Sequence, residues 1–176
     1  MDAERLLGLV EAACQEVRTR WAVIGGMAMN AYGHARTTMD FDIAAEDSSR
    51  NALLSRLAAE GFEILNDVEG FSNLLHADSA LGRLDVLWLD GTTANRLFAR
   101  LRHLPGPGGR DVPVPAPEHL VAMKVRSIQS QPTRVFRDGA DLEHLLRIPD
   151  LDDNESRGFF KRAGLLDLYD RLRRPR

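Results

Sequence analysis

The 176-residue chain has a single cysteine, Cys14, and only two lysines among its 23 basic residues. One cysteine excludes an intramolecular disulfide and a cysteine-rich zinc module, and its position in LLGLVEAAC predicts a buried thiol. The net charge of −3 provides no overall basic field for recruiting nucleic acid or an anionic membrane. No run of residues approaches the roughly 20 apolar positions that a membrane-spanning helix requires.

The N-terminal segment MDAERLLGLVEAAC also lacks the long apolar run of a signal peptide. Its apolar residues recur with helical spacing, which predicts an amphipathic helix from about Ala3 to Val17. We therefore expect a cytoplasmic protein.

Short apolar segments bounded by turn residues predict an α/β (α+β) fold. Strands are expected at WAVIGG, TMDFDIAA, FEIL, FSNLLHA and GRLDVLWLD, with NDVEG as the turn between the third and fourth. Helices are expected at MAMNAYG, DSSRNALLSRLAAEG, PEHLVAMKVRSI and FRDGADLEHLLRI, and between residues 154 and 172.

The Pro/Gly-rich connection HLPGPGGRDVPVPAPEH separates a sheet-bearing part from a helical part. We accordingly divide the chain into a core with the sheet and the functional site, residues 1–104, and a second part, residues 105–176. The second part comprises the connection and a C-terminal helical segment packed on the core.

Two carboxylates stand one residue apart in the second predicted strand. Side chains at i and i+2 of a strand point the same way, so Asp40 and Asp42 share one face. Met39, Phe41 and Ile43 are expected to pack inward on the other face. Because unpaired buried carboxylates cost several kcal/mol each, we expect a cation to offset the charge of the pair.

A third carboxylate, Asp85, repeats this pattern in RLDVLWL, where Leu84, Val86 and Trp88 are expected to face the core. If the two strands are neighbours, the three acids can bind one or two divalent cations, and oxygen-only ligation favours Mg²⁺ or Mn²⁺. The alternative for each acid taken singly is a surface aspartate on a half-exposed strand.

The glycine pair Gly25-Gly26 lies between a predicted strand and a short predicted helix. Glycine lets a phosphate approach the backbone closely, and amides at the start of a helix bind anions. A Gly-Gly turn alone is usually only a turn. Its place just before the acidic strand suggests a polyphosphate site beside the carboxylates.

The stretch IGGMAMNAYGHARTTMDFDIAA resembles the signature of the DNA polymerase β-like nucleotidyltransferase superfamily. The run Arg36-Thr37-Thr38 resembles small bacterial members, including toxins of toxin–antitoxin and abortive-infection systems. The resemblance continues at Asp85, which matches the third carboxylate of the superfamily, and extends more loosely to Lys124 and the segment RDGADLEHLL. It departs at Met27, where many members have serine, and at Arg137, where toxin-like members often have lysine.

The resemblance implies a nucleotidyltransferase fold, in which a short mixed β-sheet is flanked by helices. It also implies a reaction: an acceptor hydroxyl attacks the α-phosphorus of a nucleoside triphosphate and pyrophosphate leaves, with two metal ions assisting. Asp40, Asp42 and Asp85 would hold Mg²⁺ or Mn²⁺. Asp85 would also help to deprotonate the acceptor hydroxyl.

The resemblance also implies roles for further residues. Gly25, Gly26, Arg36 and Thr38 are expected to bind the nucleotide. Lys124 would neutralise charge on the triphosphate, and the alternative for it is a surface lysine. Asp141, three residues after Asp138 on a predicted helix, is expected to orient Lys124 or Arg137.

Two classes of acceptor fit the resemblance. A toxin-like enzyme would modify tRNA or a protein and be silenced by an antitoxin partner, whereas a resistance-type enzyme would modify a small hydroxylated compound. A patch of Arg126, Arg134, Arg137 and the basic tail from Arg171 to Arg176 could contact RNA. The competing hypothesis is an inactive scaffold of the same fold that acts through protein partners.

Overall fold

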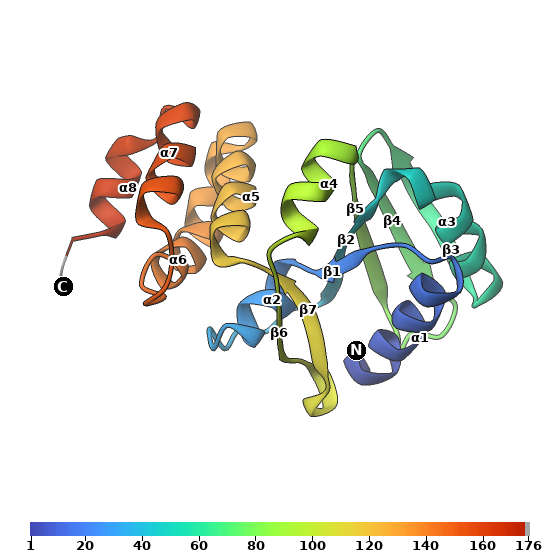
Figure 1. Ribbon diagram of the computed structural model, residues 1–176. Coiled ribbons are helices and arrows are strands. Elements are labelled where there is room, and N and C mark those ends of the chain that lie inside the picture. The colour runs from blue at the N-terminus through green and yellow to red at the C-terminus, as the bar shows by residue number, and fades with distance from the viewer. Residues whose placement is uncertain (175–176) are drawn as a thin grey trace. The chain divides into compact units, whose positions relative to one another are not determined.

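The two strands that carry the predicted carboxylates pair in parallel inside a five-stranded sheet. The order is β1 (Trp21–Val23), β2 (Asp40–Glu46), β5 (Arg83–Leu89), β4 (Phe71–His76) and β3 (Phe62–Val68). All other neighbours are antiparallel. The structure is a computed structural model and describes residues 1–174 (Figure 1). The predicted mixed sheet flanked by helices is confirmed.

One face of the sheet supplies the core of this part of the chain. Phe41 and Ile43 on β2 and their register partners Leu84 and Val86 on β5 are fully buried. Helices α1 (Ala3–Glu16) and α3 (Arg50–Ala59) contact each other, and each buries an apolar stripe. Cys14 lies in the stripe of α1, and its burial raises the pKa of the thiol to about 12, so the predicted buried thiol is confirmed.

Met39 is an exception to the predicted pattern, because 73% of its surface is exposed. Strand β2 begins only at Asp40, so the strand alternation does not extend back to Met39.

The chain forms two compact units, Met1–Pro115 and Ala116–Arg176. Strands β6 (Leu101–Pro105) and β7 (Asp111–Pro115) form an antiparallel hairpin in the first unit. The Pro/Gly-rich connection is therefore largely ordered as a strand and its turn, and Gly108 and Gly109 adopt positive φ values of 68° and 73° there.

The second unit is helical, as the sequence predicts. It contains α5 (Pro117–Ser130), α6 (Val135–Leu145), α7 (Asp153–Ala163) and α8 (Leu166–Leu172). Pro117 occupies the first turn of α5, and Gly164 ends α7 in the left-handed conformation. Pro175 and Arg176, the end of the basic tail, lie outside the described residues. No helix within residues 1–174 is long and apolar enough to cross a membrane.

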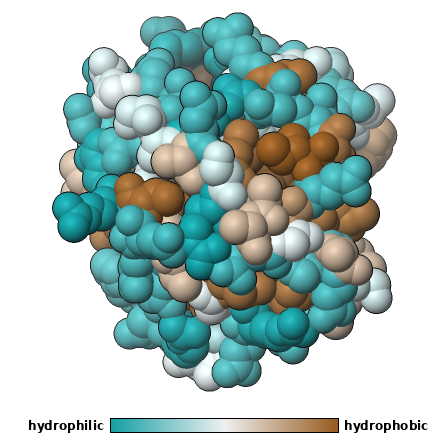
Figure 2. All heavy atoms as spheres, turned by 90° about the vertical axis from the view of Figure 1, so that its right-hand side faces the viewer, coloured by the Kyte–Doolittle hydropathy of each residue, from teal (hydrophilic) through white to brown (hydrophobic). Residues whose placement is uncertain are grey.

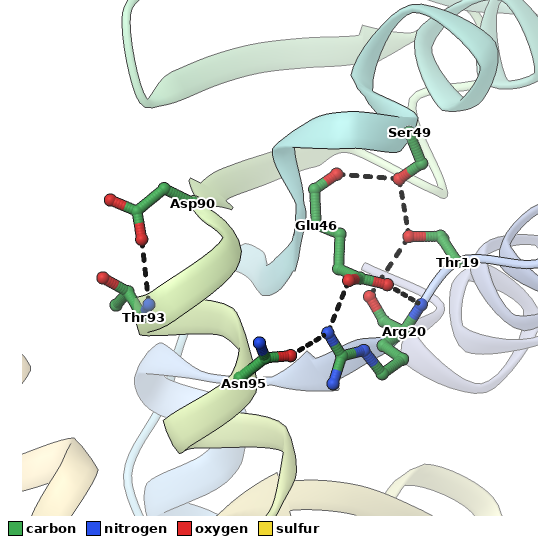
Figure 3. Close-up of polar contacts among 7 residues, drawn as sticks. All are labelled: Thr19, Arg20, Glu46, Ser49, Asp90, Thr93 and Asn95. Atoms are coloured by element: carbon green, nitrogen blue, oxygen red, sulfur yellow. Dashed lines mark hydrogen bonds and ion pairs between the residues drawn. The ribbon is translucent and has the colours of Figure 1, made fainter.

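Two further helices belong to the first unit, α2 (Gly25–Ala31) and α4 (Gly91–Phe98). Helix α4 was not predicted, although DGTTANRLF carries a recognisable start signal. The Asp90 carboxylate accepts a hydrogen bond of 2.8 Å from the Thr93 amide, which caps the helix (Figure 3).

A polar network fastens the carboxyl end of β2 to its surroundings (Figure 3). Arg20 donates to Glu46 at 2.6 Å and to Asn95 at 2.8 Å. The Ser49 hydroxyl donates to the Glu46 carbonyl and lies 2.5 Å from the Thr19 hydroxyl. The network connects the chain before β1, the end of β2 and helix α4.

Strand β3 forms one edge of the sheet and runs through most of the predicted NDVEG turn. Ile64, Leu65 and Val68 are exposed apolar residues on it, as is Leu75 on β4. A bulge between Ile64 and Asn66 interrupts the register. Figure 2 shows brown apolar atoms gathered on this side of the molecule. Such a bulge disfavours extension of the sheet at an exposed edge.

Candidate active site

The three predicted acids come together on one face of the sheet. Asp42 on β2 is the register partner of Asp85 on β5, so their side chains stand side by side. Asp40 is two residues before Asp42 on the same strand and shares its face. The structure therefore places the three carboxylates at the amino-terminal ends of two adjacent parallel strands.

Asp85 is held by two nitrogen donors. The Asn73 side chain on β4 donates a hydrogen bond of 2.7 Å to Asp85 Oδ1, and Arg83 Nε donates one of 2.8 Å to the same oxygen. Asn73 and Asp85 are both buried, so the amide fixes the carboxylate from inside the sheet face.

Arg83 is the feature of the site that the sequence analysis did not identify. It is the register partner of Asp40 and stands two residues before Asp85, so it belongs to the acidic face. The hydrogen bond to Asp85 raises the pKa of the guanidinium, and the charges of Asp85, Asp40 and Asp42 raise it further. The spacing rule that grouped Asp40 with Asp42 could have found Arg83 beside Asp85.

The donor set suits an oxygen-preferring cation, because three carboxylates on adjacent strands offer hard ligands. In the arrangement described for residues 1–174, however, no three His, Cys, Asp or Glu side chains could hold a metal ion. In this arrangement, Asp85 Oδ1 accepts hydrogen bonds from both Asn73 and Arg83. The residue types fit Mg²⁺ or Mn²⁺.

The glycine pair packs directly against this face. Gly25 has a φ of +60°, and a Cβ added to it would lie 2.1 Å from Asp42 Oδ2. A Cβ on Gly26 would lie 2.7 Å from Thr38 Oγ1. The Ile24 amide donates a hydrogen bond to the Asp42 carbonyl at 2.9 Å. Both glycines are therefore needed for close packing between the start of α2, the acidic strand and Thr38.

The loop between α2 and β2 carries the other expected nucleotide-binding residues. The Arg36 amide donates to the Asn30 side chain at 2.8 Å, and the Thr38 hydroxyl donates to the Asp40 carbonyl at 3.1 Å. Asn30, Gly33, Ala35, Arg36 and Thr37 line an open hollow of about 440 Å³. The Arg36 guanidinium also approaches Gly26, so the hollow adjoins the glycine pair.

Lys124, Asp138 and Asp141 form an ion cluster in the second unit. The Lys124 ammonium lies 3.2 Å from Asp138 Oδ1 and 2.5 Å from Asp141 Oδ2. Ser127 and Arg134 also donate to Asp138, each at 3.1 Å. Burial raises the pKa of Asp138, but the positive charges and hydrogen bonds of Lys124 and Arg134 outweigh this effect, and the pKa is lowered overall. Lys124 is thus a largely buried, paired lysine.

No family model matches the chain, and no curated protein matches it by sequence. Among solved structures, the antibiotic-resistance factor ANT(2'')-Ia matches with a TM-score of 0.72 at 16% identity, over 98% of this chain and 96% of that chain. It has also been crystallised with adenylyl-2''-tobramycin.

Two other solved structures share this likeness. The lincosamide antibiotic adenylyltransferase LnuA gives a TM-score of 0.56 at 15% identity, over 82% of this chain and 97% of that one. An antigenic nucleotidyltransferase-like protein from Paracoccidioides brasiliensis also gives 0.56, at 16% identity, over 95% and 91%. At these identities the likeness concerns the fold, and the predicted nucleotidyltransferase fold is confirmed.

Proposed function

We propose that this protein is a metal-dependent nucleotidyltransferase that moves a nucleoside monophosphate from a nucleoside triphosphate to an acceptor hydroxyl. The observation that carries the proposal is the pairing of Asp42 with Asp85 on adjacent parallel strands, with Asp40 on the same face. This arrangement occurs in a chain with the fold of the nucleotidyltransferases. Three acids on one sheet face have no evident use in an inert scaffold.

In the proposed reaction, Asp40 and Asp42 would hold Mg²⁺ or Mn²⁺ together with Asp85. The bound metal would stabilise negative charge on the phosphate oxygens during in-line displacement. Asp85 would accept the proton of the acceptor hydroxyl, because the buried Asn73 amide keeps its carboxylate oriented. The attacking hydroxyl belongs to the acceptor, and the leaving pyrophosphate belongs to the nucleoside triphosphate.

We assign the nucleotide to the side of the site formed by Gly25, Gly26, Arg36 and Thr38. The absence of side chains at the glycines lets the acidic strand and the loop approach each other closely. The adjoining hollow contains Arg36, a residue suited to phosphate oxygens. These observations support a triphosphate site beside the carboxylates.

We further assign Lys124 to the triphosphate and Asp141 to positioning Lys124. The distance of 2.5 Å between Lys124 Nζ and Asp141 Oδ2 supports the positioning role. Because Lys124 is paired with two carboxylates, its ammonium is orientated before any substrate binds. The substitution Lys124→Met should therefore reduce transfer more than it weakens nucleotide binding.

A small hydroxylated compound is the acceptor class that we favour. ANT(2'')-Ia has been crystallised with an adenylylated antibiotic, and LnuA is an adenylyltransferase of lincosamide antibiotics. A tRNA or protein acceptor with a controlling antitoxin is the alternative. In the second unit, Arg134 of the proposed RNA patch is already paired with Asp138, which weakens that alternative.

The proposal can be tested with labelled ATP, CTP, GTP and UTP and Mg²⁺, against small hydroxylated compounds, total tRNA and cell protein. Label should pass from one nucleotide to one acceptor class, and Asp42→Asn should abolish transfer while preserving the fold. Asp47→Asn, at a half-exposed position beyond β2, is the matched control.

Mg²⁺ with that nucleotide should also stabilise the wild type, by about 2.7 kcal/mol at a hundredfold excess over Kd. Transfer retained by Asp42→Asn would refute the assignment. An absence of both transfer and stabilisation would favour the inactive scaffold.

A further inference from the structure

The acidic face of the sheet contains its own cation. Arg83 donates from Nε to Asp85 Oδ1 at 2.8 Å, and its register partner across the parallel pair is Asp40. No other basic residue lies on the described stretch of β2 or β5. The guanidinium therefore neutralises part of the negative charge of the acidic face and reduces the repulsion between the carboxylates of the two strands.

The two donors to Asp85 differ in their freedom to move. Asn73 is buried, whereas 43% of the Arg83 side chain is exposed. The guanidinium can therefore swing into solvent without opening the sheet, while the amide continues to hold the carboxylate. Asp85 is accordingly prepared to exchange one partner and retain the other.

We propose that Arg83 is the resident counterion of the acidic face, and that a divalent cation binds only by displacing its guanidinium from Asp85. This inference rests on the proposed function, because it concerns the same metal site. Arg83 is a positioning residue here: it acts through Asp85 and sets the affinity for the metal ion. A bare metal ion then binds weakly, because it must replace an existing ion pair as well as shed water.

The same exchange couples the metal ion to the nucleotide. A displaced guanidinium is best stabilised by a new anion, and a triphosphate supplies phosphate oxygens that suit arginine. The nucleotide should therefore strengthen metal binding in the wild-type protein by accepting Arg83. This synergy should be lost when Arg83 carries no charge.

The experiment measures Mn²⁺ binding to the metal-free full-length protein, by calorimetry and by the electron paramagnetic resonance signal of unbound Mn²⁺. Arg83→Gln should lower the Kd for Mn²⁺ alone about tenfold, because the competing positive charge is gone. It should also lower the Tm of the metal-free protein, because the positive charge beside Asp85 is then lost. Adding a non-hydrolysable nucleoside triphosphate analogue should tighten Mn²⁺ binding in the wild type and much less in the variant.

Two further variants serve as controls. Arg83→Lys keeps the charge and should remain within about threefold of the wild-type Kd. Arg56→Gln removes an arginine that pairs with Glu16 and Glu60 instead of the acidic face, and should leave Mn²⁺ affinity unchanged. Equal or weaker Mn²⁺ binding by Arg83→Gln, or equal tightening by Arg83→Lys, would overturn the counterion role while the metal site stands.

Asp42→Asn separates failure of the inference from failure of the proposed function. If the wild type binds Mn²⁺ and Asp42→Asn does not, the metal ion occupies the proposed site and the comparison of Arg83 variants decides the inference. If Mn²⁺ binds neither the wild type nor Arg83→Gln, with or without the nucleotide, both the metal site and the counterion role are refuted.

Discussion

At the scale of single residues, the acidic face depends on a glycine that has no room for a side chain. Gly25 combines a φ of +60° with a contact to the Asp42 carboxylate, so an added methyl group would strain the backbone and also push Asp42 aside. Gly33 shares the positive φ, at +85°, but an added Cβ there would meet nothing within 4 Å. A comparison of Gly25 with Gly33 therefore separates the cost of backbone strain from the cost of a steric clash with Asp42.

We therefore predict that Gly25→Ala destabilises the protein more than Gly33→Ala. The second substitution should cost about 1–2 kcal/mol, the penalty of a left-handed conformation for a residue with a Cβ. Gly25→Ala should exceed that value and also impair Mn²⁺ binding through the displaced Asp42. Urea unfolding of both variants measures the difference. Equal losses of stability in the two variants would show that the Asp42 side chain moves aside at no cost in free energy.

The sequence predicts the positions of the acids better than it predicts their partners. Strand periodicity is sufficient to put Asp40 and Asp42 on one face, and Asp85 follows once its strand is recognised. The hydrogen bond from Asn73 to Asp85 depends on the pairing of β4 with β5, which local patterns do not encode. Arg83 lies two residues before Asp85 on the same strand, within reach of the same spacing rule. The prediction that Met39 packs inward is wrong for a local reason, because the strand starts one residue later than its apolar pattern suggests.

At the scale of elements, the contact between α5 and α6 is fixed by buried charges. Asp138 on α6 receives Lys124 and Ser127 from α5, and Arg134 from the preceding turn. Because its pKa is lowered in the folded protein, the ionised carboxylate contributes stability above its unfolded pKa of about 3.8. That contribution is lost as the pH falls through the lower, folded value.

Asp138→Asn should consequently destabilise the protein near neutral pH by about 2–4 kcal/mol, because it removes a negative charge that pairs with the largely buried Lys124. The difference from the wild type should begin to shrink as the pH falls below about 4, where the carboxyl group of the unfolded chain is protonated, and should shrink further as the pH falls through the lower, folded pKa. Glu143→Gln, which removes a partly exposed pair between Glu143 on α6 and Arg147 just after that helix, is the control and should cost no more than about 0.5 kcal/mol. Denaturant unfolding across this pH range tests both. A difference that is constant with pH would contradict the role of ionised Asp138.

Helices and strands are predicted correctly where one face of a segment is apolar. They are missed where a capping residue or a contact with another element determines the structure. The amphipathic α1 and the Pro117 start of α5 were identified from sequence. The main sequence signal for helix α4 is its N-cap residue, Asp90. Strand β3 passes through polar residues because Asp67 is held by Arg50 and Ser72, contacts that come from other elements.

At the scale of the whole molecule, the chain has two sets of buried side chains. The first unit buries the sheet residues, and the second buries Leu142, Leu145 and Phe160 among its helices. The Phe160 ring packs edge-on against Tyr169, with centroids 5.3 Å apart. Each unit is therefore expected to respond separately to a cavity in its core.

Phe160→Ala should remove about 3–5 kcal/mol of packing from the helices of the second unit. Hydrogen exchange measured by mass spectrometry should show faster exchange in α5 to α8, whereas the amides of β2 and β5 should keep their protection. Leu84→Ala, in the core of the first unit, should give the converse pattern. Uniform acceleration across the chain in either variant would mean that the two units unfold as one.

The parallel pairing of β2 with β5 also sets when the site can exist during biosynthesis. Antiparallel neighbours can form as a hairpin, but α3, β3 and β4 must be made before β5 can align beside β2. A nascent polypeptide that has not yet released Leu89 from the ribosome carries Asp40 and Asp42 without the strand that completes their site. Translation must therefore pass the end of β5 before the three carboxylates can share one face of the sheet.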